Sequence, residues 1–345
     1  MRSAIAKPSP DLDHPMRLPL RVHRLLRWPA FRINHALGRY EPVVWLIGEG
    51  RSGTTWVANL INVDGRSREL FEPVHPRYNP AFAHLPYHAY RAPDANDPEL
   101  EAKLRQVMTG RMTHWWIDKT NRRLIYRGLI VKDIYASLLA AWAVARLPWV
   151  RPIVLIRHPF AVAHSKRATM ERQRFRWPDN IAVLTGQADL MHDHLAPFQT
   201  VLEEAQARDD FIICQIALWA AIHHVLFRQF SPDAVRVVFY EDVLTAPAAA
   251  MAPLAAFLDD ARLAQAPDTT RLHRRRVVSS AEEVMVQRQG GPPSWERHLS
   301  AAQLEHGRTI LQAFGLDGLY DAGGQPVRQW LSRFPIGDRT AMRAC

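Results

Sequence analysis

The stretch from Val43 to Trp56, VVWLIGEGRSGTTW, constrains the fold of this chain more than any other. Its first five residues form a continuous apolar run, which is typical of a strand buried on both faces in a parallel sheet. A glycine-rich loop follows, and Thr54 and Thr55 can begin a helix that buries Val57 and Leu60. Because the loop amides and the positive end of the helix dipole point at one place, this arrangement predicts an anion-binding site.

The loop departs from the usual nucleotide-binding pattern at one position. The glycines at positions 48 and 53 fit G-x-x-x-x-G-K-[ST], but Thr54 occupies the place of the lysine. That lysine contacts the β- and γ-phosphates of a nucleoside triphosphate, so its absence argues against a triphosphatase or an ordinary kinase. Arg51 supplies a fixed positive charge inside the loop instead, which can bind a terminal anionic group in bidentate fashion. A glycine turn that merely joins a strand to a helix is the alternative interpretation.

Strand and helix patterns alternate along the rest of the chain, which predicts a parallel α/β sheet. Further strands are expected at Glu69–Glu72, Leu129–Val131, Ile153–Ile156 and Val235–Tyr240. Further helices are expected at Pro98 to about Thr113, at Ala136–Arg146, from Pro159 onward, and at about Ile212 to Phe230. We therefore predict a P-loop-type parallel sheet flanked by helices on both faces in a single domain. Such sheets bind ligands outside the carboxyl ends of their strands, where the loop, Glu72, Lys132 and Arg157 all fall.

Length and composition agree with one domain. The chain has 345 residues, of which 48% are hydrophobic and 23% charged, as in a soluble globular protein. We expect the α/β domain at residues 41–320, with a basic N-terminal arm at residues 1–40 and a C-terminal tail at residues 321–345. No apolar run reaches the ~18 residues of a membrane span, since Ala136–Ile156 is interrupted by arginine and proline. With no signal-peptide core and only two cysteines, a cytoplasmic location is expected.

The net charge of +10 indicates an anionic partner. We find no recognition helix and no aromatic-basic reader motif, so nucleic acid is not expected. From Arg17 to Arg39, basic residues alternate with apolar ones. We interpret this arm as packed on the domain with its arginines in water, and an amphipathic arm in peripheral contact with a membrane is the other interpretation.

A second motif follows the strand at Ile153–Ile156. Arg157 ends that strand and Ser165 follows eight residues later, about two turns into the next helix. At this spacing both side chains can reach one phosphate beside the glycine-rich loop. A strand-end arginine alone is commonly only a surface charge, so the motif gains its meaning from the loop.

These motifs resemble those of the sulfotransferases that use 3′-phosphoadenosine 5′-phosphosulfate (PAPS). RSGTTW at Arg51–Trp56 resembles the family's 5′-phosphosulfate loop, and RHPFAVAHS at Arg157–Ser165 its 3′-phosphate motif. RQGGPPSWERHL at Arg288–Leu299 resembles a third motif, R-K-G-x-x-G-x-W-x-x-H, but has Gln289 for the lysine and Pro293 for the second glycine. FYED at Phe239–Asp242 is similar to a strand-end segment common in these enzymes.

The resemblance implies a PAPS site and assigns residues to it. Contacts to the 5′-phosphosulfate are implied for Arg51, Ser52, Gly53, Thr54 and Thr55, and a contact to adenine for Trp56. On the 3′-phosphate side it implies Arg157, Ser165, Arg288, Gln289 and Gly290. In-line sulfuryl transfer requires positioning and stabilisation of charge on the departing phosphate, for which backbone amides, Arg51 and Lys132 are candidates. No metal is required.

A general base must deprotonate the acceptor hydroxyl. The small-molecule branch uses a histidine within K-T-H, but here the run is Lys132-Asp133-Ile134. FEP at Phe71–Pro73 resembles the carbohydrate branch, which carries a glutamate near the end of its second strand, and Lys132-Asp133 resembles the tyrosine branch. We therefore expect Glu72 to be the base, with His75 as the alternative. In the alternative interpretation, Glu72 has a structural role only, as a strand-end carboxylate that pairs with an arginine such as Arg77.

We thus predict transfer of a sulfuryl group from PAPS to an acceptor hydroxyl, with a carbohydrate or glycolipid favoured. That acceptor class follows from the FEP likeness, the aromatic loop from Tyr78 to Tyr90, and Trp115–Trp116. A peptide tyrosine remains open. The rival interpretations are a P-loop nucleotide kinase-like phosphotransferase, a catalytically inactive nucleotide-binding interaction protein, and a nucleic-acid-binding protein.

Overall fold

The structure is a computed structural model. It describes residues 29, 30, 33, 36, 40, 43–121, 123, 125–173, 176–178, 180–230, 234–260, 263 and 294–333. Most of the expected N-terminal arm, and the site residues Arg288, Gln289 and Gly290, therefore lie outside the described residues.

Five parallel strands form one sheet in the order β2-β3-β1-β4-β5. They are β1 (Val43–Gly48), β2 (Ser67–Phe71), β3 (Gly128–Asp133), β4 (Val150–Ile156) and β5 (Arg236–Phe239). All five expected strands are present, with bounds that differ from expectation by no more than three residues. The predicted parallel α/β fold is confirmed.

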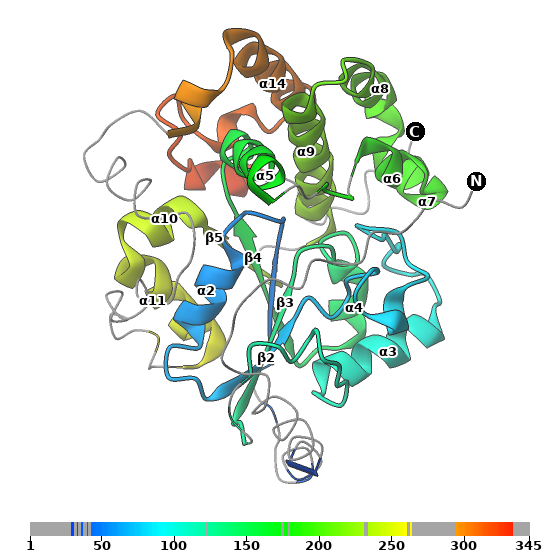
Figure 1. Ribbon diagram of the computed structural model, residues 1–345, viewed down its shortest axis with the longest axis vertical. Coiled ribbons are helices and arrows are strands. Elements are labelled where there is room, and N and C mark those ends of the chain that lie inside the picture. The colour runs from blue at the N-terminus through cyan, green and yellow to red at the C-terminus, as the bar shows by residue number, and fades with distance from the viewer. Residues whose placement is uncertain are drawn as a thin grey trace.

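The helices cover both faces of this sheet (Figure 1). The longer ones are α2 (Thr54–Ile61), α3 (Pro98–Met108), α4 (Ala140–Arg146), α5 (Pro159–Gln173), α8 (Gln199–Ala207), α9 (Phe211–Gln229), α10 (Tyr240–Thr245), α11 (Pro247–Leu258) and α14 (Ala301–Ala313). Shorter ones are α6 (Ile181–Thr185), α7 (Ala188–Leu190) and the short 3₁₀- or π-helical segments η1 (Pro80–Phe82), η2 (Met191–Leu195), η3 (Ala196–Phe198), η5 (Ser294–His298), η6 (Asp317–Leu319) and η7 (Arg328–Arg333).

Two expected helices are shorter than the sequence indicated. The one expected to reach about Thr113 ends at Met108, and Gly110 follows with a left-handed φ of 65° against the Tyr40 ring. The one expected from Ala136 begins only at Ala140. Both differences change helix ends and leave the order of elements intact.

The strands show why helices are needed on both faces. Along β1, Val43, Trp45 and Ile47 belong to one buried hydrophobic cluster, and Val44 and Leu46 to another. The first cluster contains side chains of α3, α4, α5 and α9, and the second those of α2, α10 and α11. Because successive side chains of a strand point to opposite faces, the continuous apolar run in the sequence gives a strand that is buried on both faces of the sheet.

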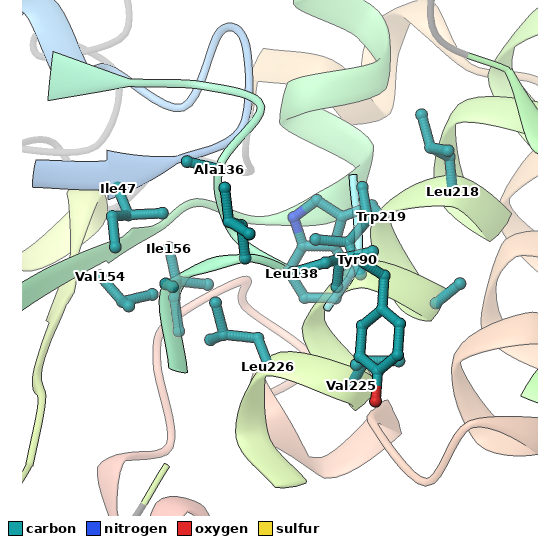
Figure 2. Packing of buried hydrophobic residues seen from close by; sticks show 14 of the residues in the cluster. Ile47, Tyr90, Ala136, Leu138, Val154, Ile156, Leu218, Trp219, Val225 and Leu226 are labelled. Carbon is teal, nitrogen blue, oxygen red and sulfur yellow. The ribbon is translucent and has the colours of Figure 1, made fainter. Parts of the chain in front are cut away.

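Helix α9 is the central helix of the larger cluster. Figure 2 shows Leu226 beside Val154 and Ile156 of the sheet, and Trp219 beside Leu138. By length and composition, helix α9 could cross a membrane, and it is a better candidate for a membrane span than the Ala136–Ile156 stretch considered from the sequence. In this fold, however, 83% of its most apolar window is buried inside the domain, so it serves as a core helix.

The expected C-terminal tail is described as far as Arg333. Within it, Trp330 is buried and contacts the ring of Phe227 on α9, at 5.7 Å between centroids. Arg328 pairs with Asp242 of α10. This described part of the tail therefore packs on the domain.

Candidate active site

The carboxyl ends of the five strands bring the chemistry-bearing residues of the sequence to one edge. Across the sheet these ends are Phe71 (β2), Asp133 (β3), Gly48 (β1), Ile156 (β4) and Phe239 (β5). The connection after β1 leads toward β2, whereas the connection after β4 leads toward β5. The crevice between β1 and β4 is therefore the topological switch point, which is where open α/β sheets bind ligands.

The loop after β1 is shaped by short local contacts. Both the backbone N–H and the hydroxyl of Ser52 donate to the carbonyl of Glu49, at 3.1 and 2.6 Å. Gly53 caps helix α2 with a left-handed φ of 94°, and a Cβ at this position would lie 2.5 Å from the Tyr240 ring. No side chain caps α2 and its first turn carries no acidic residue. The N-terminus of α2 thus keeps its positive dipole end for an anion.

Arg51 joins the first two motifs directly. Its Nε donates to the hydroxyl of Ser165 at 3.0 Å, and its carbonyl oxygen accepts from Nη1 of Arg157 at 2.8 Å. Ser165 is the seventh residue of α5, as expected two turns into the helix. Two guanidinium groups, one hydroxyl and a helix N-terminus therefore meet beside the crevice, a donor set that matches an anion with more than one charged group.

Aromatic rings flank this cluster. The guanidinium of Arg157 lies over the ring of Tyr240, 4.5 Å from its centroid, and Tyr240 packs edge-to-face on Trp56 at 5.6 Å. Trp56 itself is buried. Of the loop residues assigned to the phosphosulfate, Ser52 and Thr54 are buried and Thr55 is exposed.

The described end of the third motif lies against the second. Trp295 stacks on His158 at 4.5 Å, and His298 stacks on His164 at 4.6 Å. The carbonyl of His298 accepts from Nη2 of Arg167 on α5 at 2.6 Å. Burial lowers the pKa of His158 to about 3, so its ring is neutral and stacks as an aromatic group. The first two motifs and the described end of the third, far apart in the sequence, thus meet around the first half of α5.

Glu72 and Lys132 form a buried ion pair on the other side of the loop. Their side-chain atoms Oε1 and Nζ are 2.5 Å apart, and the amide of Glu72 donates to the carbonyl of Lys132 at 2.6 Å. The partner of Glu72 is therefore Lys132, on the adjacent strand, and not Arg77 as the structural interpretation suggested. Glu72 has a left-handed φ of 48°, which is rare for a residue with a side chain and is concentrated at functional sites.

His75, the alternative base, is a buried aromatic neighbour of this pair. Burial is the main cause that lowers its pKa to about 4, so the ring is neutral at pH 7. Its Nδ1 accepts from the amide of Arg77 at 3.2 Å, which places the proton of the neutral ring on Nε2. In this tautomer the ring has no further acceptor nitrogen to take up a proton.

Asp133 fixes the segment that carries both candidates. One of its oxygens accepts from the amide of Val74 at 3.1 Å, and the other from Nε1 of Trp45 at 3.1 Å. Full burial raises the pKa of this carboxyl to about 7. Since both oxygens are engaged, Asp133 holds the backbone between Glu72 and His75.

An aromatic group surrounds His75 and extends toward solvent. Tyr78 stacks on Trp116 at 4.0 Å, and Trp115 next to it is 55% exposed. The Nζ of Lys119 lies 3.5 Å from the ring centroids of both Trp116 and Phe71. The aromatic loop from Tyr78 to Tyr90 and the segment around Trp115–Trp116, both favoured from the sequence for acceptor binding, thus meet at the Glu72 side of the site.

The sequence reasoning missed one buried pair beneath the loop, Glu49 and Lys166. Lys166 directly follows Ser165, and its Nζ lies 2.5 Å from Oε1 of Glu49. The only signal was a charged residue close to each motif, Glu49 shortly before the first and Lys166 directly after the second, 117 positions apart. Among the described residues, no group of three or more His, Cys, Asp or Glu side chains is placed to hold a metal ion.

No protein-family model matches this chain, and no curated protein sequence matches it either. Solved structures do match. Sulfotransferase STF9 from Mycobacterium avium is 11% identical with a TM-score of 0.44, covering 92% of this chain and 82% of its own. Mouse sulfotransferase SULT7A1 complexed with PAP is 13% identical with a TM-score of 0.43, covering 88% and 92%. The sulfotransferase domain from the curacin biosynthetic pathway is 15% identical with a TM-score of 0.35, covering 64% and 75%.

All three structures carry the name of the family that the motifs resemble. Their sequence identities to this chain do not exceed 15%, so we base the proposed function on the residues of the site itself.

Proposed function

We propose that this chain is a sulfotransferase that moves a sulfuryl group from PAPS to an acceptor hydroxyl. The observation that carries the proposal is the contact of Arg51 with both Ser165 and Arg157 at the switch point of the sheet. This contact joins the loop suited to a 5′ anionic group with the motif suited to a second phosphate. A nucleotide with phosphate groups at both its 5′ and 3′ positions matches such a paired site better than a triphosphate does.

The residues on the donor side have complementary tasks in this proposal. The amides at the start of α2 and Arg51 bind the 5′ group and stabilise the charge that grows on the leaving phosphate. Arg157 and Ser165 bind the 3′-phosphate, and Trp56 and Tyr240 supply aromatic surface near it. The donor supplies the sulfuryl group, whose bond to the 5′-phosphate oxygen breaks as a bond to the acceptor oxygen forms.

Glu72 is the proposed general base. It stands at the carboxyl end of β2, two strands away from the loop, where an acceptor can lie between base and donor. Its carboxylate can take the proton of the acceptor hydroxyl, and Lys132 holds it in place. The tautomer of His75 and its low pKa favour Glu72 over His75 for this task.

A carbohydrate or glycolipid is the proposed acceptor class. Support comes from the aromatic group beside Glu72, since Tyr78, Trp116 and the exposed Trp115 offer faces on which a sugar ring can pack. A cytoplasmic enzyme in contact with a membrane surface through its N-terminal arm fits such an acceptor and the net charge of +10. Peptide tyrosine is the competing acceptor.

Transfer from labelled PAPS to panels of carbohydrates, glycolipids and tyrosine peptides tests the proposal. Formation of a sulfated product from any hydroxyl acceptor, at a rate that falls by about 10² to 10⁴ in Glu72→Gln, supports it, and the panel that reacts identifies the acceptor class. Magnesium-dependent turnover of ATP, with no transfer from PAPS, would favour the phosphotransferase interpretation instead.

A further inference from the structure

A buried lysine lies directly beneath the loop that is proposed to bind the 5′-phosphosulfate. Lys166 has no exposed surface, and its Nζ donates to Oε1 of Glu49 at 2.5 Å and to Oε1 of Gln215 at 2.8 Å. Glu49 sits within the loop between two glycines and is 1% exposed, and Gln215 belongs to α9. The lysine thus links the loop, α5 and α9.

Trp177 completes the support of the loop. Its Nε1 donates to the carbonyl of Lys166 at 3.1 Å, and its ring centroid lies 5.2 Å from the lysine Nζ. A Cβ built on Gly50 would lie 2.8 Å from the same ring. Because Ser52 donates twice to the carbonyl of Glu49, the position of Glu49 also fixes the loop at Ser52.

The charge of Glu49 is the reason for the pairing. A carboxylate inside an anion-binding loop repels the ligand, and in a poorly solvated site this repulsion is strong. A buried lysine in contact with that carboxylate cancels the charge and provides its hydrogen bond. The backbone of the loop can then face a 5′ anion without a net negative charge behind it.

We infer that Lys166 is a positioning residue of the donor site. Through its contact with Glu49 it holds the phosphosulfate loop in place, and it cancels the negative charge of Glu49 so that the loop can bind the 5′ anionic group. This inference rests on the proposed function and deepens it, because it assigns the pair to the 5′ end of the nucleotide and not to the 3′ end.

Three probes separate the two ends of the site: adenosine 5′-monophosphate, adenosine 3′-monophosphate and adenosine 3′,5′-bisphosphate. Calorimetric titration of Lys166→Met should show binding of both 5′-phosphorylated probes weakened about tenfold or more, with the 3′-monophosphate changed by less than about threefold. The double variant Glu49→Gln with Lys166→Met should recover most of the loss, since the buried charge is gone. Lys103→Met, on the surface of α3, is the matched control and should bind as the wild type does.

Glu49→Gln alone carries the test if Lys166→Met does not fold. It leaves the lysine charge beneath the loop uncancelled, so the 5′-monophosphate should bind as tightly as to the wild type or more tightly. Equal weakening of all three probes in Lys166→Met, no recovery in the double variant, or weaker binding by Glu49→Gln would overturn the inference and leave a purely structural ion pair. A wild-type chain that binds none of the probes would instead overturn the proposed function itself.

Discussion

The Nε of Arg51 donates a hydrogen bond of 3.0 Å to the hydroxyl of Ser165, across 114 positions of the sequence. The bond connects the glycine-rich loop after β1 to the second turn of α5. The groups proposed to bind the two ends of one nucleotide are therefore in direct contact, so a change at either should be felt at the other.

This contact predicts energetic coupling. In a double-mutant cycle with Arg51→Ala and Ser165→Ala, the losses in binding free energy for the bisphosphate should differ from additivity by about 0.5–3 kcal/mol. Thr169→Val serves as the control for Ser165→Ala, because the Thr169 hydroxyl donates only within α5, to the carbonyl of Ser165. Additive losses from Arg51 and Ser165 would show that the contact has no part in binding.

Arg157→Ala should weaken the binding of nucleotides that carry a 3′-phosphate more than the binding of nucleotides that lack one. The guanidinium is proposed to bind that group, so adenosine 3′,5′-bisphosphate should lose affinity about tenfold or more beyond any loss for the 5′-monophosphate. Titration calorimetry measures both. Arg151→Ala, at an exposed position of strand β4, which Arg157 directly follows, is the control. Equal losses for the two nucleotides would refute the assigned contact.

Gly53 and Gly315 offer a matched pair of left-handed glycines. An alanine at either position costs about 1 kcal/mol of stability from the backbone alone. At Gly53 the new Cβ would also meet the Tyr240 ring at 2.5 Å, whereas nothing lies within 4 Å at Gly315. We expect Gly53→Ala to weaken bisphosphate binding about tenfold or more, and Gly315→Ala to bind the bisphosphate as the wild type does. Similar affinities in the two variants would contradict the proposed role of the loop conformation in binding.

Glu72→Gln should separate chemistry from donor binding. The amide keeps the shape of the side chain but cannot accept the proton, so sulfuryl transfer should fall by about 10² to 10⁴ while bisphosphate affinity stays near the wild-type value. His75→Gln is the companion variant and should retain most of the activity. If His75→Gln were the inactive one and Glu72→Gln turned over normally, the assignment of the base would be reversed.

The neutral, buried His75 predicts a pH-dependent stability. Its pKa is about 4 in the folded protein against 6.5 when unfolded, so between these values the unfolded chain binds the additional proton. The contribution of the neutral His75 to the free energy of unfolding is fully present above pH 6.5 and is lost as the pH falls through 4. Between these values the free energy of unfolding changes by up to about 1.4 kcal/mol per pH unit because of this group. Denaturant unfolding measured at several pH values between 4 and 6.5 should show that the free energy of unfolding of His75→Gln depends less steeply on pH than that of the wild type. His192→Gln, at a side chain 89% exposed, is the control, and an unchanged slope in His75→Gln would contradict the prediction.

The sequence was sufficient to predict the parallel sheet and the edge that carries the site. Continuous apolar runs mark strands buried on both faces, and Glu72, Lys132 and Arg157 stand where those runs stop. Their placement at one edge follows from parallel strand topology and requires no knowledge of side-chain contacts.

The pairing of charges could not be predicted. Register decides it, since Phe71 lies opposite Lys132 and so brings Glu72 beside the lysine instead of beside Arg77. The pair of Glu49 and Lys166 depends on how α5 packs under the loop, a contact between elements that a single sequence does not encode locally. Helix ends depended likewise on tertiary contact, as at Gly110 against Tyr40.

The most direct test of the donor site is calorimetric binding of adenosine 3′,5′-bisphosphate and of ATP, each with and without magnesium. Our account predicts tight binding of the bisphosphate that is independent of magnesium, and weak binding of ATP, because Arg51 and Arg157 are proposed to bind two separate anionic groups and Thr54 occupies the place of the triphosphate lysine. Absence of bisphosphate binding, or a magnesium-dependent preference for ATP, would contradict it.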